Sequence, residues 1–326
     1  MGCSVRFEHL LEGAASNRMD AFVQSFLLSV LPSGSQIIET QSYRPDYLRY
    51  PIRVSVRTQQ GDLQHCVVKK GNKRDLIEHE ARVLRALTEW GIPVPTVLGE
   101  LTELSEETGN GALMVLSELP GRPLPWLGIT SLAEAELTCH LLIDGVTRLH
   151  RLTEQVRKHD IAATLPQCTL ASEFEDVVQS AGDWFQQDLF ARAIEQLNDV
   201  LTHITTQPVF SNGDYNPLNF LYDGEALTGF VDFEGACFED PHIGFAKFLI
   251  WSTDEYGWGA GKKAGLVERY LYAQDVSRHE FAPRLVLRCL RHLLKEVSID
   301  NSEDAPEREH LLQIITEGLM TMKVGK

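Results

Sequence analysis

Short apolar runs alternate with turn residues over residues 36–70. The runs at 52–57 and 63–69 flank the polar segment 59–62, which contains Gly61. Runs of β-branched residues with a glycine turn between them predict an antiparallel meander. Further strands are predicted at 97–101 and 113–116.

A helix is predicted between the third strand and the fourth. Apolar residues recur there at helical spacing until Gly91, and two prolines follow. This pattern is typical of a helix that packs one face against a sheet. The predicted apolar face consists of Leu76, Val83, Leu84 and Leu87.

Long helical periods replace the strand pattern in the second part of the chain, over 131–152 and 171–204, with one β-like stretch at 209–233. A sheet-rich first third therefore joins a helix-rich remainder, which predicts an α+β fold. The segment 117–122 contains a Pro-Gly pair and is the expected linker. The predicted domains are residues 1–120 and 121–326.

The chain is acidic, with 30 Lys and Arg against 46 Asp and Glu over 326 residues and a net charge of −16. Such a protein repels phosphate backbones, so nucleic acid and anionic membrane surfaces are not expected partners. Residues 1–120 contain 12 cations and 15 acids, whereas residues 121–326 contain 18 and 31. The second part therefore mildly favours a cationic ligand.

Six cysteines stand singly, without the paired spacing of zinc sites or disulfide frameworks. The N-terminal region lacks a basic segment followed by a long apolar run, so neither a signal peptide nor a membrane-spanning helix is expected. These features together predict a cytoplasmic protein.

A hairpin turn is predicted at Asp223-Gly224, between two short apolar arms. A two-residue turn would place Asp232 opposite position 215, and a four-residue turn would place it opposite position 217. Either register brings Asp232 beside the loop that precedes the hairpin.

That loop contains Asp214 and Asn219, so the hairpin gathers two carboxylates and a carboxamide. A set of oxygen ligands suits Mg²⁺, which prefers a few carboxylate or amide oxygens together with substrate phosphates. The alternative is that these residues only serve turns, as Asp and Asn do in most loops. The second carboxylate, which returns at Asp232 after a glycine turn, favours the metal site.

Gly213, Asp214, Asn219 and the Asp-Phe-Glu triplet that begins at Asp232 resemble the catalytic loop and metal-binding segment of the aminoglycoside phosphotransferase and choline kinase family. The resemblance implies a two-lobed, protein-kinase-like fold, with an N-terminal antiparallel sheet lobe containing one main helix and a mostly helical C-terminal lobe. It also implies a small-molecule kinase that transfers the terminal phosphate of ATP or GTP to a hydroxyl. By the same resemblance, Asp214 is the catalytic base, and Asn219 and Asp232 hold Mg²⁺.

A kinase of this fold needs a lysine on a strand and a glutamate on the following helix. Lys69 shares a strand face with Val67, and Glu80 falls on the apolar helix face, where a charge needs a buried partner. We therefore expect Lys69 and Glu80 to pair at the nucleotide phosphates; the alternative is a solvated strand end and helix flank. The resemblance further implies that the Ser117 carbonyl and the Leu119 amide bind adenine.

Three features depart from the family pattern. Residues 41–47 lack the glycine expected in the loop that covers the phosphates. Asn212 stands where the family usually has His, and Gly244 stands where a further Asp commonly anchors the catalytic loop. These departures leave an alternative open, a degenerate pseudokinase that binds nucleotide or a partner without turnover.

Aromatic and acidic residues follow the metal-binding segment and form a candidate acceptor site. Carboxylates and rings can hold an amine by ion pairing and cation–π contact, as an aminoglycoside, choline or an amino sugar would require. The alternative is that the rings pack inside the helical lobe while the acids face water. The candidate acceptor residues are Trp251, Asp254, Glu255, Tyr256 and Trp258.

Overall fold

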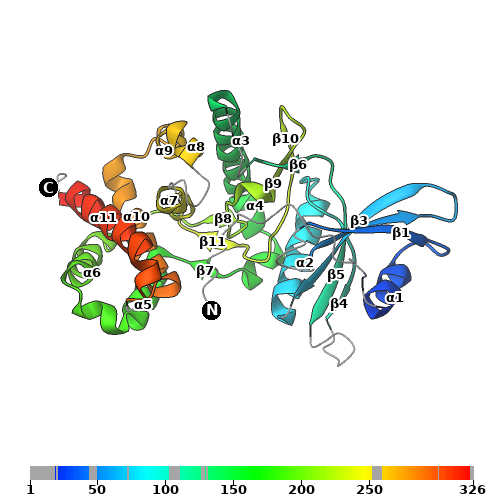
Figure 1. Ribbon diagram of the computed structural model, residues 1–326, viewed down its shortest axis with the longest axis horizontal. Helices are drawn as coiled ribbons and strands as arrows, with labels where there is room; N and C mark the ends of the chain where they lie inside the picture. The colour runs from blue at the N-terminus through cyan, green and yellow to red at the C-terminus, as the bar shows by residue number, and fades with distance from the viewer. Residues whose placement is uncertain are drawn as a thin grey trace.

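A sheet lobe and a helical lobe lie side by side along the longest dimension of the structure, a computed structural model (Figure 1). The α+β class expected from the sequence is confirmed, with the large sheet in the first part of the chain and most helices in the second. The structure describes residues 19, 21–43, 50–71, 73–102, 111–125, 129, 131–251, 259–299 and 301–323.

The sheet lobe contains a five-stranded antiparallel sheet with the strand order β1-β2-β3-β5-β4. The predicted meander forms its first three strands, and the turn after β2 places Gly61 at a φ of 91°. The strands are β1 (Gln36–Ser42), β2 (Ile52–Arg57), β3 (Leu63–Gly71), β4 (Val97–Leu101) and β5 (Ala112–Ser117).

One helix covers each face of this sheet, α1 (Ala21–Val30) on one side and α2 (Arg74–Glu89) on the other. Strand β5 separates the two cores, because Met114 packs in the core that contains α2, whereas Leu113 and Val115 pack in the core that contains α1. Successive side chains of a strand point to opposite faces, so a strand with both faces covered is apolar throughout.

The buried face of α2 differs from the predicted face at its first position. Leu84 and Leu87 are fully buried, but Leu76 is 38% exposed and Ile77 is buried instead. Each step of four residues turns about 40° further around a helix with 3.6 residues per turn, so Leu76, two such steps before Leu84, has rotated out of the face. Glu80 does lie on the buried face, with 1% of its surface exposed.

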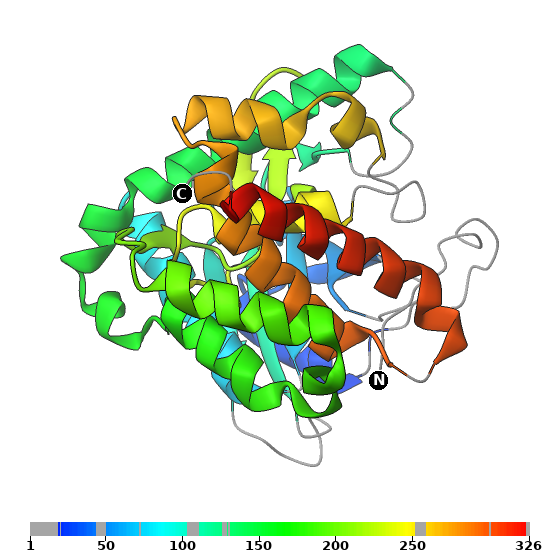
Figure 2. The same ribbon diagram turned by 90° about the vertical axis from the view of Figure 1, so that its left-hand side faces the viewer.

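The helical lobe packs α5, α6, α10 and α11 against one another at the end of the molecule that faces the viewer in Figure 2. The helical pattern predicted for 171–204 is divided between two helices, because Gly182 has a φ of 48° in a short 3-10 turn between them. The helices are α3 (Leu132–Arg151), α4 (Thr153–Arg157), α5 (Leu170–Ser180), α6 (Asp188–Leu201), α7 (Ile243–Ile250), α8 (Gly259–Lys263), α9 (Leu266–Ala273), α10 (Arg278–Glu296) and α11 (Ala305–Lys323).

Two three-stranded sheets lie in the second part of the chain, with the orders β10-β9-β6 and β7-β11-β8. Among the residues that the structure describes, every helix is too short or too polar to cross a lipid bilayer. The strands of the small sheets are β6 (Arg122–Pro123), β7 (Gln167–Cys168), β8 (Val209–Ser211), β9 (Phe220–Tyr222), β10 (Leu227–Phe230) and β11 (Cys237–Glu239).

The hairpin of β9 and β10 has the longer of the two turns that the sequence allowed. Tyr222 pairs with Leu227, and Asp223 closes the four-residue turn by accepting two backbone N–H groups at 3.0 Å. A bulge in β10 then shifts the register by one residue. The amide of the residue before Asp232 donates to the Asn219 carbonyl at 3.0 Å, which brings Asp232 beside the loop as expected.

Candidate active site

Lys69 of β3 and Glu80 of α2 form the ion pair that the sequence pattern predicts. Lys69 Nζ lies 2.7 Å from Glu80 Oε2. The same ammonium lies 2.6 Å from Asp232 Oδ1 and 3.2 Å from Glu234 Oε2. Three carboxylates therefore surround one lysine, and the loop after β10 supplies two of them. Glu234 was not among the predicted site residues, although it lies in the motif that identified Asp232.

Burial decreases through this cluster from the sheet lobe outward. The side chains of Glu80, Lys69, Asp232 and Glu234 are 2%, 19%, 40% and 47% exposed. Burial raises the pKa of Glu80, and the neighbouring ammonium opposes this effect. Burial by itself would lower the pKa of Lys69, but the three carboxylates together outweigh it and raise the pKa. Lys69 therefore remains charged at any physiological pH.

The turn that presents Asp232 is fixed by Glu80 and by aromatic packing. Asp232 has a φ of 64°, a left-handed conformation that a residue with a side chain adopts only when its surroundings hold it there. The amide of Phe233 donates to Glu80 Oε1 at 3.2 Å, and the buried ring of Phe233 stacks beside Phe210. One oxygen of Glu80 thus binds the lysine, and the other binds the loop.

Two asparagines hold the loop that carries Asp214. Asn212 Nδ2 and Asn219 Nδ2 each donate to the Asp214 carbonyl oxygen at 3.0 Å. Gly213 has a φ of 81°, and a Cβ there would lie 2.0 Å from the carbonyl oxygen of Gly235, so only glycine fits. Asn212 therefore supports the loop from the position where the family pattern has His.

Tyr215 explains why glycine is present at position 244. A Cβ on Gly244 would lie 2.4 Å from the Tyr215 ring, so the ring occupies the space that an aspartate would need. The buried Tyr215 hydroxyl lies 2.8 Å from His150 Nε2. Burial lowers the pKa of His150 to about 4, so this imidazole is neutral at pH 7 and serves the packing of the loop.

A second lysine, which sequence reasoning missed, lies at the loop that carries Asp214. Lys247 of α7 forms an ion pair with Asp214 Oδ1. Only 3% of the Lys247 side chain is exposed, against 49% of Asp214. Burial lowers the pKa of Lys247, and Asp214 opposes this effect. The available signal was a single charge within a helix that is otherwise apolar.

The sequence profile of the phosphotransferase enzyme family matches residues 53–284, well over half of the chain. The chain belongs to this family. The resemblance drawn from the motifs is thereby confirmed, and the protein is a small-molecule kinase of the phosphotransferase class. No curated protein matches the sequence of this chain.

Solved structures of aminoglycoside phosphotransferases share its fold. A thermostable mutant of APH(4)-Ia, in a ternary complex with AMP-PNP and hygromycin B, superposes with a TM-score of 0.64 and 16% identity, covering 91% of this chain and 98% of that one. APH(2'')-Ib bound to ADP superposes with a TM-score of 0.56 and 14% identity, covering 92% of this chain and 99% of that one. The type VIII aminoglycoside-3'-phosphotransferase superposes with a TM-score of 0.53 and 19% identity, covering 86% of this chain and 100% of that one. The expected two-lobed, protein-kinase-like architecture is therefore confirmed.

The segment that joins the lobes of the phosphotransferase is tied to the large sheet. The Ser117 amide donates to the Thr96 carbonyl at 2.9 Å, and Ser117 Oγ accepts from the Thr96 amide at 2.8 Å. Between Ser117 and Leu119, the carboxylate of Glu118 accepts two hydrogen bonds from Arg53, at 2.6 and 3.1 Å. The backbone groups expected to bind adenine therefore lie on a segment with a fixed course.

The predicted acceptor cluster lies mostly outside the described residues. Trp251 follows α7, and its ring lies 5.2 Å from Lys247 Nζ, so this ring already faces a cation of the protein itself. Residues 44–47 of the segment that replaces the glycine loop also lie outside the described residues. So do four residues of the predicted acceptor cluster, Asp254, Glu255, Tyr256 and Trp258.

The oxygen ligands at this site fit a magnesium ion. One oxygen from each of Glu80, Asp232 and Glu234 lies within 4.8 Å of the other two. Asn219 uses its amide nitrogen for the Asp214 carbonyl, which leaves its side-chain oxygen as the atom suited to a metal. Hard carboxylate and amide oxygens are the donors that Mg²⁺ prefers, and two of the four groups, Asp232 and Glu234, are partly exposed.

Proposed function

We propose that the protein is a cytoplasmic, Mg²⁺-dependent kinase that transfers the terminal phosphate of ATP or GTP to a hydroxyl of a small molecule. One observation carries this proposal. Lys69 and Asp232, 163 residues apart in sequence, meet at 2.6 Å beside the loop that presents Asp214. A lysine, a cluster of carboxylate oxygens and the half-exposed carboxylate of Asp214 thus lie together, which supports roles in phosphate binding, metal binding and catalysis.

The residues divide between the two substrates, and the division follows the proposed domains, 1–120 and 121–326. Lys69, positioned by Glu80, binds the nucleotide phosphates, while the Ser117 carbonyl and the Leu119 amide bind the adenine ring. Bound Mg²⁺ supplies positive charge that neutralises the phosphates during transfer. The proposed metal ligands are Asn219 and Asp232, with Glu234 available beside them.

The chemistry asked of the protein is mainly orientation and a single proton transfer. The acceptor hydroxyl gives its proton to a carboxylate oxygen of Asp214 while its oxygen forms a bond to the terminal phosphorus. The bond from that phosphorus to the bridging oxygen breaks, and the nucleoside diphosphate leaves with the electron pair. Asp214 suits this role because its carbonyl is held by two asparagines while its carboxylate is half exposed.

Alcohols that also contain amines are the acceptors that we propose first. The acidic excess of residues 121–326, with 31 acids against 18 cations, supports this class. The related APH(4)-Ia structure contains hygromycin B, which gives further support. The proposed acceptor residues are Trp251, Asp254, Glu255, Tyr256 and Trp258.

A product-mass screen tests the function directly. The purified chain is incubated with Mg²⁺, ATP or GTP, and aminoglycosides, choline, ethanolamine, amino sugars or neutral sugars. We expect one acceptor class to gain the mass of a phosphate group. Asp214→Asn should lower the turnover by about 10³-fold with nucleotide binding retained, because the general base is lost. Asp223→Asn, a matched change in the exposed hairpin turn, should keep wild-type activity.

The same screen can contradict the proposal. Nucleotide binding without phosphoryl transfer to any acceptor, and without slow nucleotide hydrolysis, would favour the pseudokinase. Phosphoryl transfer that survives Asp214→Asn would remove Asp214 from its role as the base while leaving the kinase function in place.

A further inference from the structure

Lys247 is the one charged residue of α7, which reads Ile-Gly-Phe-Ala-Lys-Phe-Leu-Ile. The helix is buried between the catalytic loop and α10, and the lysine is buried with it. Moving an ammonium group out of water is unfavourable unless a partner compensates, and an apolar residue of similar volume would make the same packing contacts without that cost. The position therefore costs folding free energy, which is typical of a residue kept for function.

The partner of Lys247 is the proposed catalytic base. The ammonium binds Asp214 Oδ1 from the interior, while the carboxylate remains half exposed. Within the described part of the chain, Lys247 is the only residue that forms an ion pair with Asp214. The loop of residues 213–219 contains no lysine or arginine of its own, so the positive charge beside the base comes from α7.

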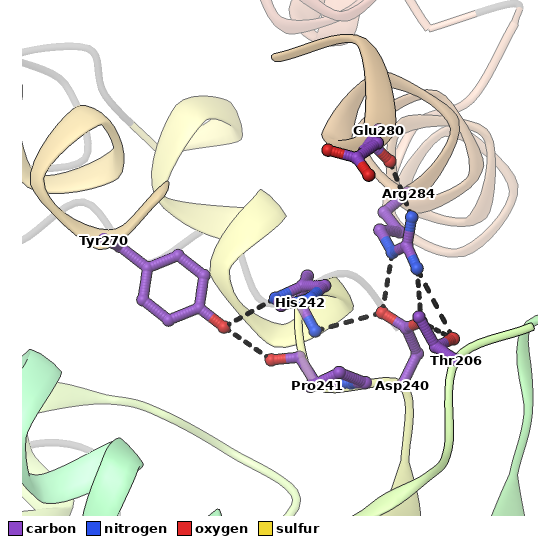
Figure 3. Close-up of polar contacts among 7 residues, drawn as sticks. All are labelled: Thr206, Asp240, Pro241, His242, Tyr270, Glu280 and Arg284. Carbon is purple, nitrogen blue, oxygen red and sulfur yellow. Dashed lines mark hydrogen bonds and ion pairs between the residues drawn. The ribbon is translucent and has the colours of Figure 1, made fainter. Parts of the chain in front are cut away.

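The start of α7 is fixed by a buried polar network, which Figure 3 shows. Arg284 of α10 donates to both carboxylate oxygens of Asp240 at 2.8 Å, and the His242 amide donates to Asp240 Oδ1 at 3.0 Å. The Tyr270 hydroxyl donates to the Pro241 carbonyl at 2.6 Å. A helix anchored in this way holds Lys247 at a defined place beneath the catalytic loop.

The stacking of Tyr270 extends this support from the anchor into α7. The Tyr270 ring stacks on Phe245 with centroids 3.6 Å apart and an interplanar angle of 3°.

Burial is the largest influence on the pKa of Lys247, and it lowers this pKa. Among the charged groups that face the lysine, Asp214 raises the pKa, Arg288 of α10 lowers it and Glu239 of β11 raises it. Arg288 thus repels the ammonium and Glu239 attracts it, while Asp214 is the carboxylate that contacts it directly.

We propose that Lys247 is a positioning residue for phosphoryl transfer. It holds Oδ1 of Asp214 toward the protein interior, so that Oδ2 faces the acceptor hydroxyl. It also compensates the carboxylate charge at the point where a negatively charged phosphate must approach. This inference rests on the proposed function, because it assigns Asp214 as the base.

A pair of measurements on Lys247→Met separates this role from a structural one. Met fits the buried site without a charge, so we expect the thermal midpoint to stay within about 2 °C of wild type or to rise. We expect kcat to fall about 100-fold while KM for the nucleotide changes less than about threefold, because only the orientation of the base is lost. Arg278→Met, which removes an exposed ion pair with Glu268, is the matched control and should change neither quantity.

A double-mutant cycle then identifies the residue through which Lys247 acts. In the Asp214→Asn background, Lys247→Met should lower the remaining kcat by less than about twofold, because the group that it positions is already absent. Equal losses in both backgrounds, or a kcat of Lys247→Met near wild type, would overturn the inference while leaving the kinase function intact. If the wild-type chain transfers no phosphate to any acceptor, the proposed function fails first, and the thermal midpoint of Lys247→Met still reports whether the lysine is structural.

Discussion

The two lysines of the candidate active site are held in opposite ways. Lys69 lies within 3.2 Å of three carboxylates and keeps 19% of its side chain exposed, whereas Lys247 has one carboxylate partner and only 3% exposure. Accordingly, the pKa of Lys69 is raised, because its carboxylates outweigh burial, and the pKa of Lys247 is lowered, because burial outweighs its carboxylate. An excess of negative charge holds the first lysine, and packing holds the second.

This difference matches what the two ends of the site must do. The Lys69 cluster carries two surplus negative charges, so in the proposed function its partly exposed members, Asp232 and Glu234, would take up a cation while Lys69 would bind phosphates. The pair of Lys247 and Asp214 carries no surplus charge, and its lysine is buried. The end proposed to bind nucleotide is therefore held by charge, whereas the end proposed to hold the base is held by packing.

Lys69→Met should have the largest effect, because it removes the cation that three carboxylates share. Its loss leaves Glu80 buried without its cation, and removing one partner of a buried pair costs about 3–5 kcal/mol of unfolding free energy. We expect a destabilisation of about 3 kcal/mol in denaturant unfolding and a fall in kcat/KM of at least about 100-fold.

Two comparisons control this prediction. Lys70→Met changes the next residue of the same strand, a lysine outside the cluster. Its unfolding free energy and kcat/KM should be close to those of wild type. Mg²⁺ should stabilise Lys69→Met more than wild type, because the three carboxylates then lack their own cation. Equal stability of Lys69→Met and Lys247→Met would refute the contrast between the two lysines.

Gly244→Ala should have an intermediate effect, because it disturbs packing beneath the catalytic loop without changing a charge. The new Cβ would lie 2.4 Å from the Tyr215 ring, and overpacking of this kind costs about 1–3 kcal/mol. We expect that loss in thermal or denaturant unfolding, together with a lower kcat. In a Tyr215→Leu background the same substitution should cost less, and equal costs in both backgrounds would show that the ring is not what requires glycine.

The sequence allowed the Lys69 end of the site to be predicted far better than the Lys247 end. Lys69 and Glu80 each occupy an apolar face, and together with the family resemblance this predicted their pairing. The recognisable turn of the hairpin placed Asp232 beside the loop of Asp214, whereas its contact with Lys69 was not predicted. Leu76 was placed wrongly, because residues at a spacing of four drift around a helix. The register of the hairpin could be narrowed only to two alternatives, because the Asp223-Gly224 signal fits a turn of two or four residues. The bulge in β10 was not predicted, because bulges leave no clear signal in a short strand.

The Lys247 end depends on contacts between distant segments that no local pattern records. A lysine among apolar residues shows that α7 is unusual, but its partner on the catalytic loop is 33 residues away and is set by how α7 packs. The same holds for Gly244, which stands where the family pattern has an anchoring Asp and where the Tyr215 ring leaves no space for a side chain. Packing is a tertiary property, so a site held by packing is harder to predict than one held by a charge pattern.

The smallest expected effect concerns His150, whose burial belongs to the same packed region as Tyr215. Burial lowers its pKa to about 4, from about 6.5 in the unfolded chain, so between these values the unfolded chain binds a proton that the folded chain does not. Stability must therefore fall as the pH is lowered from 6.5 towards 4, whereas above pH 7 His150 contributes no pH dependence. Each pKa unit corresponds to about 1.4 kcal/mol, and after allowance for partial exposure we expect about 2 kcal/mol over this window.

Denaturant unfolding at pH 7.5 and pH 5 measures this contribution. His150→Gln should lose about 1–2 kcal/mol less than wild type between the two pH values, because Gln can still bond the Tyr215 hydroxyl but does not titrate. His140→Gln, an exposed position on the same helix, should keep the wild-type pH dependence. His242 and His79 also have pKa values lowered by burial, so the difference between variant and wild type is the quantity to compare. If His150→Gln and wild type lose the same unfolding free energy between pH 7.5 and pH 5, burial does not keep this imidazole neutral. A charged group would then contribute to the packed end of the site, as charged groups do around Lys69.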